Sequence, residues 1–152
     1  MNIIPRLCFI QFFCIVAFAA IAPSANAQLN IGLRTIPMKA GIYSIQAEVA
    51  DTPDLREVGL MNRTSLATNS GMLFIFEQNA GNCFWMKNTK LPLSIAFIAD
   101  DGKIVNIEEM QADTTNNHCP RAPIRYALEM NKGWFAERVI VPGNLIQGLP
   151  KR

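Results

Sequence analysis

Hydrophobic residues in this chain recur mainly at every second position, in short runs that turn-forming residues separate. Over 43–50, apolar and polar side chains alternate, which predicts a half-buried β-strand. The run 71–76 is continuously apolar and short, and this favours a strand covered on both faces. Further short strands are predicted at 94–99, 125–130 and near 145–147. The pattern therefore indicates a domain built mainly from β-strands.

Turn-forming residues predict how two of these strands are connected. The dipeptide Asp101-Gly102 has the composition of a two-residue hairpin turn, since both residues tolerate positive φ angles. A turn of this length would pair Ile98 with Val105 and Phe97 with Asn106.

Short helices and irregular segments complete the expected fold. The dipeptide Thr52-Pro53 predicts a helix start, with an N-cap followed by proline at the first helical position, and the helix should reach about Leu60. A turn of helix is expected at 134–138, and the segments 28–41 and 77–82 are expected to be a linker and a loop. The predicted fold class is mainly β: a small antiparallel sandwich, a jelly-roll-like fold or a partly closed barrel, with one or two short helices.

The amino-terminal segment has the layout of a secretory signal peptide. A positively charged start precedes the uncharged apolar run 7–21, which is shorter than the roughly 20 residues that a helix needs to cross a bilayer. Ala25-Asn26-Ala27 offers signal peptidase the small residues that it requires, which predicts cleavage before Gln28. We therefore expect an exported protein, periplasmic or extracellular, with a signal peptide at 1–27 and one β-rich domain at 28–152. The alternative is an uncleaved signal that anchors the domain at the membrane.

The charge balance bears on the class of partner. The chain has 14 Lys and Arg against 12 Asp and Glu, a net charge of +2, and removing Arg6 with the signal leaves +1. These charges are spread along the chain without a basic cluster, so no nucleic-acid partner is expected. Contact with a membrane is expected only if the signal is retained.

The cysteines change in number when the signal is removed. Cys8 and Cys14 lie within the signal, so the mature chain keeps Cys83 and Cys119. Two cysteines in an oxidising compartment predict one disulfide. Two separate buried thiols are the alternative, because the sequence does not show whether the two backbones approach each other.

Several runs along the chain, taken together and in order, resemble a family of bacterial and archaeal proteins known as domain of unknown function 192. The runs are Arg56, Gly59-Leu60-Met61, Arg63, Gly71-Met72-Leu73-Phe74, Phe84-Trp85-Met86-Lys87-Asn88-Thr89, Pro92-Leu93, Asp101-Gly102, Leu128-Glu129 and Gly133, within a family-like core of about 42–148. The resemblance implies a small, mainly β domain of the sandwich or jelly-roll kind, often secreted, and it implies no activity. One departure is Ser94, where the family usually has an aspartate; the hairpin register puts this position on an apolar face, so a mechanism that needs that acid is in doubt here.

The hexapeptide of that resemblance contains the first candidate ligand site. Trp85, Lys87, Asn88 and Thr89 offer an aromatic face, a cation, an amide and a hydroxyl within five residues, as a site for a polar or anionic ligand would require. We expect 83–87 to be extended, with Trp85 and Lys87 on the same face. The alternative is that Trp85 fills the edge of the core while Asn88 and Thr89 hydrogen-bond a turn.

Two arginines are further candidates for holding an anion. Arg56 and Arg63 are seven residues apart and would share one side of a helix that continued past Leu60, where they could bind a carboxylate or phosphate. The alternative for Arg56 is a structural ion pair with an acid such as Glu129 or Glu108.

The remaining chemistry points to a binding role. His118 beside Cys119 lacks the further ligands of a zinc site, and no serine stands in a nucleophile-elbow context, so we expect no metal, no cofactor and no assignable catalytic residue. The favoured hypothesis is a non-enzymatic cell-envelope module that binds a small polar or anionic ligand or a protein partner. The alternative is a hydrolase-like envelope enzyme whose acid or base the sequence does not identify.

Overall fold

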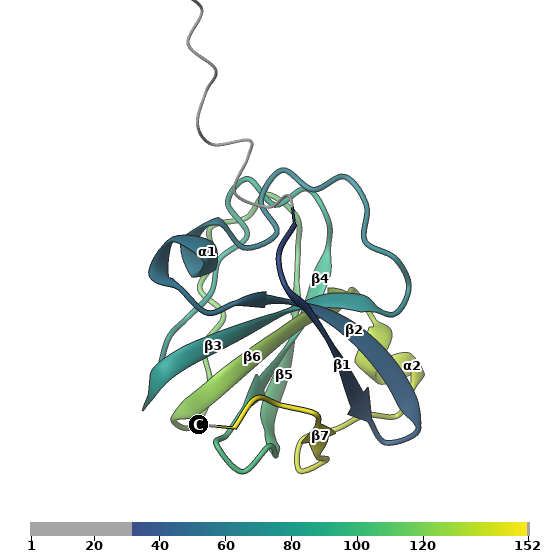
Figure 1. Cartoon of the computed structure of the whole chain (residues 1–152). Helices are drawn as coiled ribbons and strands as arrows, with labels where there is room; N and C mark the ends of the chain where they lie inside the picture. The colour runs from purple at the N-terminus through teal and green to yellow at the C-terminus, as the bar shows by residue number, and fades with distance from the viewer. Residues whose placement is uncertain (1–31, 152) are drawn as a thin grey trace, which may run out of the picture.

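The computed structural model describes residues 32–151 and shows a single sheet of seven strands that curls into a partly closed barrel (Figure 1). The predicted signal peptide and its cleavage site lie outside the described residues. In sequence order the elements are β1 (Thr35–Ala40), β2 (Tyr43–Ala50), α1 (Pro53–Val58), β3 (Ser70–Ala80), β4 (Leu93–Ile98), β5 (Ile104–Met110), β6 (Ile124–Asn131), α2 (Trp134–Glu137) and β7 (Ile146–Gln147). Neither helix in this part of the chain has the length and apolar character that a membrane span requires.

The sheet order is β5-β4-β6-β3-β2-β1-β7, and every neighbouring pair is antiparallel except β2 and β3. At the end of the barrel where β7 lies, backbone hydrogen bonds join the two edges of the sheet. The amide of Ile104 donates to the carbonyl of Asn144 at 2.9 Å, and that of Ile146 donates to Gly102 at 2.9 Å. The predicted mainly β class is confirmed, and among the predicted forms the structure matches the partly closed barrel.

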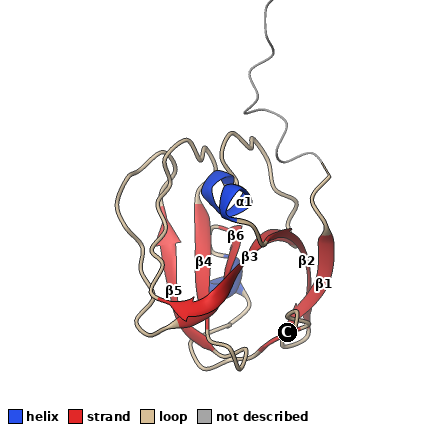
Figure 2. Ribbon diagram, turned by 60° about the vertical axis from the view of Figure 1, so that its left-hand side comes forward, coloured by secondary structure: helices blue, strands red, loops and turns tan. Residues whose placement is uncertain are grey.

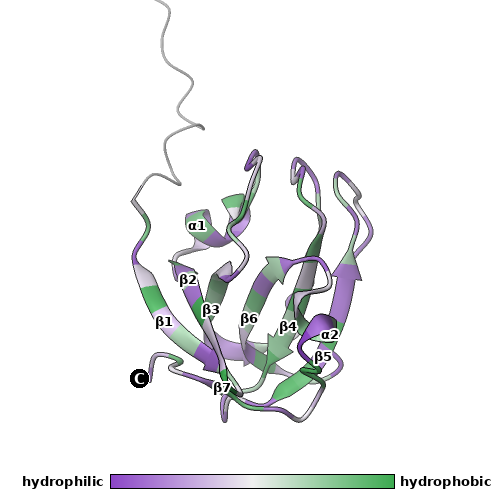
Figure 3. Ribbon diagram, turned by 90° about the vertical axis from the view of Figure 1, so that its right-hand side faces the viewer, coloured by the Kyte–Doolittle hydropathy of each residue, from purple (hydrophilic) through white to green (hydrophobic). Residues whose placement is uncertain are grey.

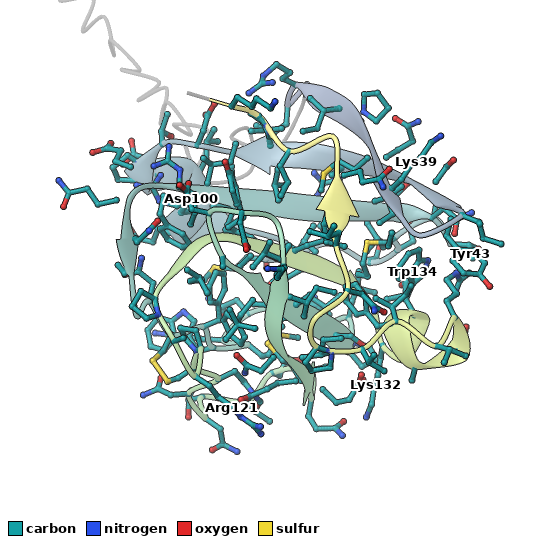
Figure 4. The ribbon with its side chains drawn as sticks, turned by 90° about the horizontal axis from the view of Figure 1, so that it is seen from below. Lys39, Tyr43, Asp100, Arg121, Lys132 and Trp134 are labelled. Atoms are coloured by element: carbon teal, nitrogen blue, oxygen red, sulfur yellow. A yellow bond between two sulfur atoms is a disulfide. The ribbon has the colours of Figure 1, made fainter. Side chains whose placement is uncertain are left out.

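One hydrophobic cluster fills the concave side of the sheet. Its members come from strands at both edges of the sheet. Side chains from opposite edges can meet only on the inner side of the curled sheet. They include Met38, Ile45, Ala47, Leu73, Ala96, Ile104, Leu128, Trp134 and Ile146. Tyr43, on β2, meets the ring of Trp134 edge-on at 6.4 Å beside α2 (Figure 4). The short helix α2, expected at 134–138, thus packs its aromatic residues into the barrel.

A second cluster covers the opposite face of β3, β4 and β6. It includes Met72, Phe74, Phe76, Met86, Ile95, Phe97 and Ala127, together with Leu60 after α1. The helix α1 and the long connecting loops lie at the top of the barrel in Figure 2, away from the end at which Figure 1 shows β7. Both faces of β4 and β6 are therefore buried, whereas β5 is mainly apolar in its first half and turns hydrophilic in its second half, before the buried Met110 (Figure 3).

Local chemistry explains the boundaries of α1. The hydroxyl of Thr52 accepts a hydrogen bond from the amide of Leu55 at 3.3 Å, and Pro53 begins the helix as predicted. The helix ends at Val58, earlier than expected, because the chain turns at Gly59 with φ of 49°. Arg56 and Arg63 consequently do not share a helix face, which corrects the prediction that rested on a longer helix.

Two segments expected to be irregular are strands instead. The predicted linker contains β1, which pairs with β2 along its whole length, from Thr35 opposite Glu48 to Ala40 opposite Tyr43. Its weak alternation was interrupted by Pro37, but β7 pairs only with Lys39 and Ala40, so this proline lies where the strand has one neighbour. The strand β3 likewise continues to Ala80 through the predicted loop.

The β4–β5 hairpin differs from the predicted turn by one residue. Asp100, Asp101 and Gly102 form a three-residue loop in which the amide of Gly102 donates to Ala99 at 3.0 Å, and only Gly102 has a positive φ, of 86°. Ile98 therefore pairs with Ile104 instead of Val105, and an irregularity beside it restores the predicted pairing of Phe97 with Asn106.

Candidate ligand-binding cavity

A cavity of about 260 Å³ opens on the convex side of the sheet, beneath α1. Its floor is on β6, one wall is the end of α1, another is β3, and the segment 82–89 forms the rest. The lining residues are Arg56, Glu57, Val58, Gly59, Leu60, Met61, Phe74, Phe76, Asn82, Cys83, Phe84, Trp85, Thr89 and Glu129.

Glu129 is the buried acid on the floor of this cavity. It stands in the sheet between Met72 of β3 and Ile95 of β4, which are its direct cross-strand partners. The residue is only 4% exposed, and no hydrogen bond or ion pair joins its carboxyl group to another residue of the described part of the chain. Burial raises the pKa of Glu129 to about 8, because the apolar surroundings disfavour the ionised form. The carboxyl is therefore mainly neutral at pH 7.

Gly71 sets the backbone position of this acid. A side chain added at Gly71 would place its Cβ in severe conflict with the carbonyl oxygen of Glu129 and the sulfur of Met130. Only glycine lets β3 approach β6 this closely. The close pairing thus fixes the backbone of Glu129 between its two apolar cross-strand neighbours.

Aromatic rings form the apolar walls. Phe74 and Phe84 meet edge-to-face with centroids 4.9 Å apart, and Phe76 meets Phe84 in the same way at 6.3 Å. Thr89, 5% exposed, adds a hydroxyl to this lining. The cavity thus combines aromatic surface with a small number of polar groups.

The rim of the cavity contains Trp85, which is 49% exposed. The ammonium of Lys87 lies 5.6 Å from the centre of the Trp85 ring, so the two side chains share one face of the segment while Met86 is buried on the other. Asn88 lies outside the lining set and adopts a positive φ of 59°, and its carbonyl accepts from the amide of Asn62 at 2.8 Å. The structure therefore places Trp85 and Thr89 at the cavity, Lys87 beside it, and Asn88 in a turn.

Arg56 lines the cavity and also ties α1 to the sheet. Its Nη1 donates to the carbonyl of Asp51 at 3.0 Å and to that of Ile75 at 2.7 Å, and the guanidinium lies 5.4 Å from the centre of the Phe76 ring. These partners differ from the carboxylates that the sequence offered as an alternative.

Arg63 is held away from the cavity lining. Its Nη2 lies 2.6 Å from Oε2 of Glu48, in an ion pair whose two side chains are about three-quarters buried. The sequence had grouped Arg63 with Arg56, and the structure assigns the two arginines to different neighbours.

The predicted disulfide between Cys83 and Cys119 is confirmed. It links the cavity wall to the loop that contains His118, and this link is reinforced by two backbone hydrogen bonds of 2.8 Å between Phe84 and His118. The ring of His118 contacts the carboxylate of Glu108 at 3.0 Å. Within residues 32–151, no three acidic, histidine or cysteine side chains gather as a metal site would require.

Ser94 is fully buried and belongs to a structural network. Its hydroxyl donates to Glu109 at 2.7 Å and accepts from the amide of Gly133 at 2.8 Å. A carboxylate at this position would lie directly against that of Glu109. The position is not part of the cavity lining, so the departure from the family pattern leaves the candidate site unchanged.

The comparisons with known proteins identify the family. Residues 35–148 match the model of DUF192, described as an uncharacterized ACR. The chain belongs to the DUF192 family. A comparison with curated proteins gives no match.

Two solved structures resemble this DUF192 protein over most of its length. One, from Sinorhizobium meliloti 1021, is named as a candidate transcription regulator and is 35% identical in sequence. The match covers 75% of this chain and 92% of the Sinorhizobium chain, with a TM-score of 0.70. The other is a protein of unknown function from Novosphingobium aromaticivorans and is 30% identical in sequence. The match covers 84% of this chain and 94% of the Novosphingobium chain, with a TM-score of 0.75.

The family resemblance and the cavity involve the same residues. Many of the runs that carried the resemblance supply its lining, namely Arg56, Gly59-Leu60-Met61, Phe74, Phe84-Trp85, Thr89 and Glu129. The sequence placed Glu129 in a strand and offered it only as a possible ion-pair partner of Arg56. The available signal was an acid within the mainly apolar run 126–130, and only the packing around it shows that it is buried at a cavity.

Proposed function

We propose that this DUF192 protein is an exported domain that binds a small molecule in the cavity beneath α1. The observation that supports this most is the carboxyl of Glu129, which is buried at the cavity floor without a hydrogen-bonding partner among the described residues. Buried polar groups are normally paired, and one that faces a cavity instead is a common feature of sites that receive a ligand. A ligand group that met this carboxyl would supply the missing hydrogen bond.

A binding role fits the lining better than the hydrolytic alternative. The raised pKa of Glu129 suits a general acid, but a hydrolase of the kind considered also needs a nucleophile or an activated water beside it. The lining contains neither serine nor histidine, and its cysteine, Cys83, is bonded to Cys119. Its one threonine, Thr89, has a hydroxyl that no hydrogen bond joins to a base among the described residues, so nothing there activates it as a nucleophile. Recognition of a ligand requires no further group.

The name of the Sinorhizobium meliloti protein raises transcription regulation as a second role, and this chain supports it poorly. The net charge is only +2, and α1 and α2 have six and four residues. A recognition helix and a basic face are the usual means of binding DNA. We therefore infer that nucleic acid is not a partner.

Export is the cellular part of the proposal. The Cys83–Cys119 disulfide is compatible with an oxidising compartment, and the segment before Gln28 has the composition of a signal peptide. When the full chain is expressed in a Gram-negative host, we expect the periplasmic fraction to yield protein whose amino-terminal sequence starts at Gln28. Full-length protein found only in the membrane fraction would contradict this part of the proposal.

Removing the indole at the rim should weaken binding without unfolding the domain. A fragment library screened by ligand-observed NMR should yield binders that shift the amide signals of 56–61 and 82–89, and Trp85→Ala should lower their affinity about tenfold, since an aromatic contact of this kind contributes about 1–1.5 kcal/mol. Leu145→Ala is the matched control, because Leu145 is also 49% exposed but lies outside the cavity. Equal losses in the two variants, or no binders at the cavity, would contradict the proposed function.

A further inference from the structure

We infer that the cavity takes a small organic molecule that presents a carboxylate or carboxamide oxygen to the carboxyl group of Glu129. This conclusion rests on the binding function proposed above and names the chemical class of the ligand and the group that recognises it. Three features of the cavity select this class of ligand: the neutral floor, the positive rim and the aromatic walls.

The floor favours a carboxyl that donates a hydrogen bond. The cross-strand neighbours of Glu129, Met72 and Ile95, are apolar and fully buried, and neither can stabilise a negative charge. In its neutral form the carboxyl has one O–H, and this group can donate to an oxygen of a ligand. An acceptor oxygen on the ligand is therefore the complementary group.

No other titratable group near Glu129, among the described residues, takes the place of the ligand's acceptor oxygen. On β3 the residues facing the cavity are Phe74 and Phe76, which carry no charge. On the same sheet face, Glu108 of β5 is separated from Glu129 by Ile95 and is engaged by His118 at 3.0 Å.

The helix α1 contributes two charges of opposite sign to the lining. Arg56 is partly buried and hydrogen-bonds backbone carbonyls, and Glu57 beside it is exposed. From the segment 82–89, Lys87 approaches the rim above Trp85. Apart from Glu129, the partly buried charge in the lining is thus the positive charge of Arg56, with Lys87 adding to it from the rim.

This arrangement disfavours a cationic ligand. An ammonium would bind an aromatic cavity through the ring faces, but the faces of Phe76 and Trp85 already receive Arg56 at 5.4 Å and Lys87 at 5.6 Å. A cation would have to compete with both side chains, whereas a carboxylate or carboxamide oxygen is attracted by them. The rim and the floor thus favour the same class of ligand head group.

The walls determine the body of the ligand. Phe74 and Phe84 present aromatic surface 4.9 Å apart, centre to centre, above the floor. A volume of about 260 Å³ is slightly below the usual range of ligand sites, which begins at about 300 Å³, and it fits a body about the size of one aromatic ring. Benzoate, benzamide and benzylamine share such a body and differ only in the head group, so they are suitable matched probes.

The test compares these three probes on the mature protein by protein-observed NMR at pH 6 and pH 9. At pH 6 we expect benzoate and benzamide to shift the amide signals around Glu129 and on 82–89, with benzylamine binding at least about tenfold more weakly, as expected for a head group that lacks an acceptor oxygen. Because the pKa of Glu129 is about 8, the neutral form falls to about one part in ten at pH 9, and the affinity for benzoate should fall about tenfold.

The variant Glu129→Gln distinguishes the effect of hydrogen-bond donation by residue 129 from the effect of its ionisation. Glutamine keeps the shape and an N–H donor but does not titrate, so this variant should still bind benzamide and benzoate, and the fall in affinity at pH 9 should disappear. The pH comparison on the unmodified protein tests the same point should the variant not fold. Preferential binding of benzylamine, lost in Glu129→Gln, would overturn the ligand class while leaving the binding function intact. Absence of cavity shifts with every probe and with the fragment library would instead remove the binding function itself.

Discussion

The free energy of unfolding of this protein should fall as the pH rises from about 4.5 to about 8, and the substitution Glu129→Gln should abolish most of that fall. Glu129 is 4% exposed and its pKa is raised from 4.5 to about 8 by burial. Between these two values the folded state keeps the proton and the unfolded state releases it. Because the folded state then binds more protons than the unfolded state, stability decreases with increasing pH through this range.

The expected size of this effect is large for a small domain. A tenfold change in proton affinity corresponds to about 1.4 kcal/mol, so a pKa raised from 4.5 to about 8 corresponds to a loss of about 5 kcal/mol at pH 8 and above. Below pH 4.5 both states are protonated and the loss disappears. Urea unfolding at pH 5, 7 and 9 should therefore give midpoints that decrease steadily for the unmodified protein.

The variant and its control make the assignment specific. In Glu129→Gln, position 129 should no longer contribute to the change in unfolding midpoint between pH 5 and pH 9, since the amide carries no titrating proton. Glu137→Gln is the control, because the side chain of Glu137 is 70% exposed and its replacement should leave the slope in place. A pH dependence that persists unchanged in Glu129→Gln would show that Glu129 is not the group responsible.

Reduction of the Cys83–Cys119 disulfide should lower stability by about 4 kcal/mol. The bond joins residues 36 apart, and restricting a loop of this length in the unfolded chain has about that effect. For a domain of this size the loss corresponds to a melting temperature lower by roughly 10 to 20 °C. The fold should persist at lower temperature, because Phe84 remains joined to His118 by two backbone hydrogen bonds and Met86 to Thr114 by a third.

The double variant Cys83→Ser/Cys119→Ser provides the same test without reductant. It should melt at the temperature of the reduced protein and should be insensitive to reductant, whereas the unmodified protein should shift. Since Cys83 precedes the cavity residues Phe84 and Trp85, affinity for a cavity probe such as benzamide should also decrease. Two free thiols in protein purified from an oxidising compartment would contradict the bridge.

Local patterns in the sequence were sufficient for most of the individual elements. The alternation at 43–50 corresponds to β2 without an error at either end, and Thr52 caps α1 as expected. These features depend on neighbours within a few residues, which a single sequence displays directly. The disulfide could also be predicted from the sequence, because only two cysteines follow the predicted signal peptide.

Elements whose form depends on distant partners were predicted less well. The weak alternation before Gly41 predicts a linker, whereas pairing with β2 and β7 makes 35–40 the strand β1. The hairpin loop was predicted one residue too short, because a positive φ at Gly102 alone suits the three-residue loop that the neighbouring strands require.

The sequence by itself determined that this protein is a mainly β domain of the DUF192 type, because strand periodicity, turn residues and the family's short motifs can be read from the chain alone. It predicted the disulfide from the number of cysteines, and the structure showed that Cys83 and Cys119 meet. The tertiary structure alone decided which residues form the cavity. Arg56, Trp85 and Glu129 lie on a helix, a loop and a strand far apart in the chain, and Arg63, grouped with Arg56 by spacing, pairs with Glu48 elsewhere. The burial of Glu129 depends on Met72 and Ile95 from two other strands, and no spacing within a single segment encodes that environment.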